Sequence, residues 1–259
     1  MVQVTRRTLL STAAASGCCA CWGVEHAYSK SLSDVGGCAL IGSDADLLDE
    51  RKIVLSDRSS ASDQFRGILR STGNHTLDIA FDRALKRISD TFGVTPGFGF
   101  YDDSDSPNAW AMPRSLIPQT AGTVLFGKQL FSTLLDINDS GISIIQVSAH
   151  EFGHIQQYAS GKYEQIGAAQ PTSKRIELHA DFVSGYYLGL LKGGHPDASF
   201  WKAGQKIYEF GDYGYNDPRH HGTPEERVMS AEAGFKLSYF QKKDFDYAFR
   251  AGIVYVSDK

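Results

Sequence analysis

The sequence contains two histidines four residues apart, His150 and His154, and Glu151 directly follows the first of them. On an α-helix, residues at i and i+4 lie on one face, about one turn apart. This spacing lets both imidazoles bind one zinc ion at two corners of a tetrahedral site. Glu151 would then lie beside the ion, where it can take a proton from a metal-bound water. The pentapeptide therefore offers two metal ligands and a general base.

The residues around this pentapeptide predict a buried helix over 142–159. Its apolar residues leave no polar face, and they are Ile142, Ile144, Ile145, Val147, Ala149, Phe152 and Ile155. Burying two imidazoles and a carboxylate is costly unless they are paired, which favours a metal site over two surface histidines. Gly153 costs roughly 1 kcal/mol relative to Ala inside a helix, so it predicts that another segment packs closely against this backbone.

A second predicted helix, 175–191, supplies a third ligand. Glu177 and Asp181 lie at i and i+4 on one face. Two His and one Glu leave one zinc position open to water, as catalytic sites do, so we expect Glu177 to be the third ligand. Asp181 is expected to accept the spare N–H of a ligand histidine, the alternative being a face of two solvated acids. His179 is expected on another face as a partly buried polar residue. The small residues expected to press this face against the first helix are Ala180, Ser184 and Gly185.

These motifs resemble those of the gluzincin metallopeptidases, and most closely the bacterial neutral zinc metallopeptidase family and the related prenyl-protease-type enzymes. The likeness covers roughly residues 98–235. It is carried by His150–His154 (HEFGH), Glu177–Asp181 (ELHAD), Pro107–Ala111 (PNAWA) and His220–Arg227 (HHGTPEER). Glu226 departs from the nearest family, where Gln is typical.

The resemblance implies a zincin-like α+β fold in a single domain. In this fold a small sheet with an edge strand packs on the buried metal helix, and a second helix carries the third ligand. It also implies one Zn²⁺ per chain and hydrolysis of peptide bonds in a protein or peptide substrate.

Substrate and transition-state contacts can be predicted from two further segments. Asn108, Ala109, Trp110 and Ala111 alternate small and larger residues as an edge strand does, and an extended peptide can pair with such an edge. An interior strand with no ligand role is the alternative. His221 is the leading candidate donor to the oxyanion, because the chain must turn sharply at Gly222 before the helix start at Thr223. Tyr213 and Tyr215 stand behind it, and a pair of solvated loop histidines, His220 and His221, is the alternative.

The N-terminus carries an export signal. Arg6 and Arg7 form a twin-arginine pattern, a weakly apolar run follows, and no acidic residue precedes Glu25. We expect residues 1–29 to be a signal peptide read by the twin-arginine export machinery, which predicts a periplasmic or extracytoplasmic protein. A short basic tail is the alternative, and Cys18 is a candidate lipid anchor. Residues 30–60 are expected to be a poorly ordered leader, and 61–259 the metallopeptidase domain.

Composition excludes several classes of protein. The net charge is −4 and no run of Lys and Arg indicates nucleic-acid binding. No stretch after the signal approaches the ~20 apolar residues of a membrane span. The mature chain keeps only Cys38, so no intrachain disulfide is expected.

Beyond the two metal helices, the expected elements are helices at 77–92, 128–136 and 200–210, strands at 97–101, 109–112 and 122–126, and a helix starting at Thr223.

Two other functions stay open. The chain is alternatively a non-catalytic exported zinc-binding scaffold or assembly protein, although such a site has no use for Glu151. It is alternatively a zinc hydrolase that acts on a non-peptide substrate, since nothing in the motifs fixes the scissile bond. Residues 161–173, between the two metal helices, are expected to form a loop.

Overall fold

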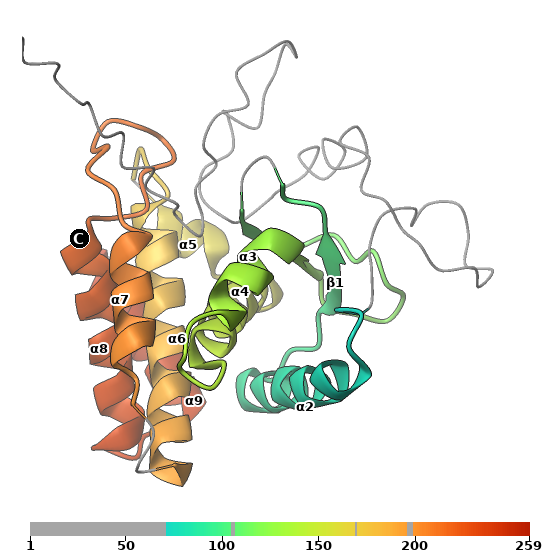
Figure 1. Ribbon diagram of the computed structural model, residues 1–259. Helices are drawn as coiled ribbons and strands as arrows, with labels where there is room; N and C mark the ends of the chain where they lie inside the picture. The colour runs from blue at the N-terminus through green and yellow to red at the C-terminus, as the bar shows by residue number, and fades with distance from the viewer. Residues whose placement is uncertain (1–70, 105–106, 169, 196–198) are drawn as a thin grey trace, which may run out of the picture.

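The computed structural model describes residues 71–104, 107–168, 170–195 and 199–259. Within these residues the chain is mostly helical with a small three-stranded sheet, a mixed α+β architecture as expected (Figure 1). The predictions of a signal peptide, a lipid anchor at Cys18 and a leader fall outside the described residues. None of the helices within the described ranges is long and apolar enough to cross a membrane.

The sheet is formed by the first part of the described chain. Its order is β1-β3-β2, with β1 parallel and β2 antiparallel to β3. β2 is therefore an edge strand of the described sheet. The elements of this part are α2 His75–Phe92, β1 Gly97–Tyr101, β2 Ala109–Met112, β3 Thr123–Gly127 and α3 Lys128–Leu135. The strand and helix predictions here are confirmed to within two residues.

An aromatic cluster holds this sheet to α2 and α3. Phe81 of α2 lies 5.2 Å from Phe131 of α3, measured between ring centroids, and 5.3 Å from Phe98 of β1. Phe100 and Phe126 complete the cluster from β1 and β3. Rings of this size bury a large apolar area and gain further from edge-to-face contacts. Ile144 and Val147 of α4 belong to the same buried cluster, so the metal helix packs on the same face of the sheet as α2 and α3.

The predicted metal helix is α4, Ile142–Ala159, with the bounds expected from the sequence. Figure 1 shows α4 in the middle of the molecule, between the sheet and the helices α6 to α9. Residues of β2 and β3 share a buried cluster with its Ala149, Phe152 and Ile155. A Cβ on Gly153 would lie 2.6 Å from Val183 Cγ2. The close approach predicted from this glycine is confirmed, and α6, Lys174–Gly194, makes it.

The small residues of α6 do not all serve the contact with α4. Ala180 lies against Gly153, but a Cβ on Gly185 would overlap the carbonyl oxygen of Ala231 in α8, Pro224–Tyr239. The expectation that Gly185 faces α4 was therefore wrong. Gly185 instead lets α6 and α8 approach each other, so α6 is packed between two helices.

The remaining helices are α5 Tyr163–Gly167, α7 Trp201–Glu209 and α9 Phe245–Ser257. Residues 161–173 therefore contain a short helix rather than only a loop, because Ile166 is buried against Ile176. The predicted start of α8 is confirmed, with a capping box between Thr223 and Glu226. Helix α9 was not predicted, although Asp244 caps it.

Candidate metal centre

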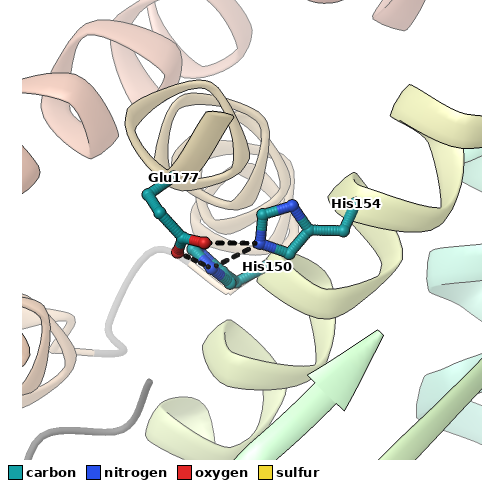
Figure 2. A group of neighbouring side chains, drawn as sticks. All are labelled: His150, His154 and Glu177. Atoms are coloured by element: carbon teal, nitrogen blue, oxygen red, sulfur yellow. Dashed lines mark hydrogen bonds and ion pairs between the residues drawn. The ribbon is translucent and has the colours of Figure 1, made fainter. Parts of the chain in front are cut away.

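Three buried side chains from α4 and α6 converge on one point (Figure 2). The Nε2 atoms of His150 and His154 lie 3.1 Å apart. The carboxylate oxygens of Glu177 lie 3.2 Å from His150 Nε2 and 3.5 Å from His154 Nε2. His154 and Glu177 are fully buried and His150 is 5% exposed. The structure thus brings together the three residues expected to be ligands.

The spacing of these atoms fits a tetrahedral metal site. Ligand atoms about 2.0–2.1 Å from a zinc ion lie about 3.3 Å from each other at tetrahedral angles, and the separation of the two Nε2 atoms is close to this value. Glu177 presents a different carboxylate oxygen to each imidazole, Oε2 to His150 and Oε1 to His154. Three buried carboxylates (Glu151, Glu177, Asp181) and one buried guanidinium (Arg227) surround this point. Two imidazole nitrogens and a carboxylate are a donor set that suits zinc.

The protonation of the ligands agrees with a cation site. Burial alone would lower the pKa of His150, but the carboxylates of Asp181 and Glu177 outweigh it and raise the pKa to about 10. Burial alone would raise the pKa of Glu177, but the nearby His154 and hydrogen bonds from both imidazoles hold it well below its usual range. Without a metal the site therefore retains a proton on His150. A bound cation would replace this proton, as metals do at buried imidazoles.

An ion pair holds the His150 ring at its Nδ1 atom. His150 Nδ1–H donates to Asp181 Oδ1 at 2.9 Å, the contact expected from the sequence. Asp181 in turn accepts from Arg227 Nε at 2.7 Å and Nη2 at 2.9 Å. Arg227 also donates from Nη1 to the carbonyl oxygen of Phe210 at 2.8 Å. This arrangement leaves His150 Nε2 facing Glu177.

The side-chain amide of Gln157 holds the His154 ring at its Nδ1 atom. Gln157 is fully buried on α4, and its Oε1 lies 3.0 Å from His154 Nδ1. Gln157 Nε2 lies 2.9 Å from the carbonyl oxygen of Ile176 and 3.1 Å from His179 Nδ1. His179 was expected to be partly buried, but it is fully buried and its Nε2–H donates to the carbonyl oxygen of Phe249 at 3.0 Å. It does not belong to the ligand group.

Glu151 has the properties of a buried base. It is fully buried, and neither of its carboxylate oxygens has a hydrogen-bond partner among the described residues. Burial raises its pKa to about 8. A buried carboxylate without a partner is costly, and a raised pKa is typical of a glutamate that exchanges protons near neutral pH. Such a side chain is suited to exchanging a proton with a water molecule rather than to a structural role.

His221 and His220 share a single carboxylate. Asp212 Oδ1 accepts from His220 Nδ1 at 2.5 Å, and Oδ2 accepts from His221 Nδ1 at 3.2 Å. Both imidazoles are buried, and both Nε2 atoms lack a partner among the described residues. His221 lies near enough to Glu177 that a positive charge on its imidazole would lower the pKa of that carboxylate. The alternative of two solvated loop histidines was therefore wrong.

The turn before α8 is as sharp as expected. Gly222 has φ +103°, a left-handed conformation that favours glycine, and a Cβ there would lie 3.0 Å from Leu178 Cδ2. This turn packs the His221 segment against the start of α6.

The other expected site residues lie in two places. Tyr213 and Tyr215 are exposed at 58% and 61%, and the hydroxyl of Tyr213 donates to Glu225. Neither tyrosine is in the buried group. Ala109, Trp110 and Ala111 lie in β2 beside α4, while Asn108 precedes them with its Nδ2 buried and without a partner among the described residues.

Three residues of this centre were not predicted as site residues: Gln157, Asp212 and Arg227. Arg227 stands in the motif that resembles the neutral zinc metallopeptidase family, which was a usable signal. Gln157 is a polar residue one turn after His154 on the metal helix, which was a weaker signal. Asp212 lies among glycines and tyrosines and gave no signal.

Comparison of this chain with protein-family models, with curated proteins and with solved structures finds no match. Its interpretation therefore rests on its own residues and their geometry.

Proposed function

We propose that the protein is a zinc-dependent endopeptidase of the gluzincin type with a zincin-like arrangement of its helices. The observation that carries this proposal is the buried group of His150, His154 and Glu177 beside Glu151, whose carboxylate has no partner among the described residues. A structural zinc site needs a closed ligand set and no adjacent base. The unpartnered Glu151 therefore favours catalysis over a scaffold role.

In this proposal His150, His154 and Glu177 hold one Zn²⁺. When bound, the ion acts as a Lewis acid that polarises the scissile carbonyl and makes water more acidic. Glu151, buried and without a partner among the described residues, accepts the proton of the attacking water and delivers it to the leaving amine.

Other residues of the chain contact the peptide and the negative charge that develops on the oxygen of the scissile carbonyl. An extended peptide pairs with the edge strand β2, next to which the buried Asn108 Nδ2 has no partner among the described residues. His221, held at Nδ1 by Asp212, donates from Nε2 to the oxyanion when it is protonated. A main-chain pairing edge favours peptides over other acyl substrates.

The substitution Glu151→Gln tests this function. We expect it to retain zinc and the fold but to cut an unfolded protein at least ~10²–10⁴-fold more slowly, the contribution of a general base. Glu164→Gln, in an exposed position of α5, is the matched control and should be fully active. Zinc itself should be lost in His150→Ala, His154→Ala and Glu177→Ala. Undiminished cleavage by Glu151→Gln would refute the mechanism, and zinc binding without any cleavage by the wild type would favour the scaffold.

We also propose that the twin-arginine pattern directs export. The change of Arg6 and Arg7 together to Lys keeps the charge but removes the pattern that the export receptor reads. The double variant should remain in the cytoplasm with its signal uncleaved, as measured by fractionation and mass. Normal delivery would point to the general secretory route.

A further inference from the structure

We propose that Gln157 and His179 form a hydrogen-bond relay that fixes the tautomer and the ring orientation of the ligand His154. The relay runs from α4 through α6 to α9, and its members are positioning residues of the metal centre. This inference deepens the proposed function and rests on it only in requiring a metal at His150, His154 and Glu177.

The carbonyl oxygen of Ile176 fixes the orientation of the Gln157 amide. A carbonyl oxygen can only accept, so the amide atom 2.9 Å from it must be the nitrogen. The amide oxygen then faces His154 Nδ1 at 3.0 Å, and this nitrogen must carry the proton. In the neutral imidazole, His154 Nε2 is therefore the unprotonated atom, and it is the one that points to Glu177.

The same logic fixes His179. The second N–H of the Gln157 amide points to His179 Nδ1 at 3.1 Å, so this ring nitrogen must accept. The proton of His179 is then on Nε2, which donates to the carbonyl oxygen of Phe249 in α9 at 3.0 Å. Both amide hydrogens, the amide oxygen and both ring nitrogens of His179 are thus used. Reversing any one bond would leave a buried donor facing a donor or a buried acceptor facing an acceptor, which costs about 1–3 kcal/mol.

The burial of this relay supports a functional reason for it. Gln157, His154 and His179 are all fully buried. An apolar side chain at 157 would avoid burying an amide, so packing alone does not call for glutamine there. Metal-bound histidines usually donate their second N–H to an acceptor that sets their orientation, and loss of that acceptor typically weakens metal binding 10–100-fold.

Zinc affinity of Gln157 variants of the full chain tests the relay. We expect Gln157→Leu to bind zinc about 10–100-fold more weakly, measured by competition with a chromophoric chelator. Gln157→Glu keeps an acceptor for His154 Nδ1, so its affinity should lie nearer to the wild type. The matched control is Gln146→Leu, which removes another buried glutamine of α4 whose Oε1 has no partner among the described residues. Its zinc affinity should be unchanged.

Equal zinc affinity in Gln157→Leu and the wild type would overturn the proposal, and so would equal losses in Gln157→Leu and Gln146→Leu. A second measurement needs no metal. Nitrogen NMR of the metal-free chain should show the proton of His154 on Nδ1 and that of His179 on Nε2, and the opposite tautomers would overturn the relay. If the wild type binds no zinc but these tautomers are observed, the proposed function fails while the hydrogen-bond relay stands.

Discussion

The protein holds two pairs of buried histidines in opposite ways. In the α4 pair, His150 and His154, the two Nε2 atoms converge at 3.1 Å and each Nδ1 has its own partner. In the loop pair, His220 and His221, the two Nδ1 atoms converge on Asp212 and each Nε2 lacks a partner among the described residues. Converging ring nitrogens beside a carboxylate suit a cation. Unpartnered ring nitrogens suit a molecule that enters from outside.

The two members of the α4 pair also differ in what supports them. Asp181 and Arg227 give His150 an ionic partner, whereas Gln157 and His179 give His154 a neutral one. If a carboxylate also supported His154, the buried centre would contain one more acidic group beside Glu151, Glu177 and Asp181. One ionic and one neutral support therefore hold both rings while limiting the charge that must be buried.

The largest expected effect is on the ionic support. Arg227→Met should lower the free energy of unfolding by about 3–5 kcal/mol, because it removes the buried guanidinium that donates two hydrogen bonds to the buried Asp181. Denaturant unfolding of the metal-free protein measures this change. Arg219→Met, which breaks the partly exposed pair with Asp217, is the control and should cost about 0–1 kcal/mol. Similar losses in the two variants would show that Asp181 does not need Arg227.

The next effect concerns the loop pair. His221→Ala should lower kcat by roughly 10²–10³, the typical cost of losing one oxyanion donor, with zinc content and KM little changed. His220→Ala should lower kcat less, because its ring lies beside the exposed Tyr215, 5.3 Å between centroids, whereas His221 is the imidazole near Glu177. Steady-state kinetics on a peptide substrate measures both. Equal losses of kcat would mean that the two imidazoles act together through Asp212.

A smaller effect is expected when Asp181 loses its charge. Asp181→Asn should weaken zinc binding about 10–100-fold, since it removes the carboxylate that orients His150. The same chelator competition compares it with Gln157→Leu, and Asp246→Asn at an exposed position of α9 is the control. A zinc affinity equal to that of the control would mean that only the neutral support of His154, and not the ionic support of His150, contributes to zinc binding.

The smallest effect is the acid sensitivity of the loop pair. Burial alone would raise the pKa of Asp212, but hydrogen bonds from His220 and His221 hold it far below its usual range. An aspartate with a lowered pKa stabilises the fold above its unfolded pKa of about 3.9, and this contribution is lost as the pH falls below that value. Asp212→Asn should thus be less stable than the wild type at pH 5, and the difference should shrink towards pH 2.

Urea unfolding at a series of pH values measures this difference. Asp90→Asn, at an exposed ion pair with Lys86, is the control and should change stability by less than about 1 kcal/mol throughout. A difference between Asp212→Asn and the wild type that stays constant from pH 5 to pH 2 would contradict the shared-carboxylate interpretation.

The sequence by itself determined the elements that local patterns specify. The bounds of α4, the strands β1 and β2 and the capping box of α8 follow from apolar periodicity and from end signals that act within a few residues. The grouping of His150 and His154 follows from helical spacing alone. Glu177 and Asp181 were predicted from the same spacing, together with the chemistry that zinc requires.

Only the tertiary structure decided which residues support the histidines besides Asp181. Asp212 meets His221 through a loop, Arg227 meets Asp181 from another helix, and Gln157 reaches His179 across a helix interface. The packing of Gly185 against α8 rather than α4 was decided in the same way. Such contacts join segments distant in sequence, and a single polar or small residue carries no periodic signal of its partner. Their positions depend on how the helices pack, because burial then requires every polar atom to find a partner.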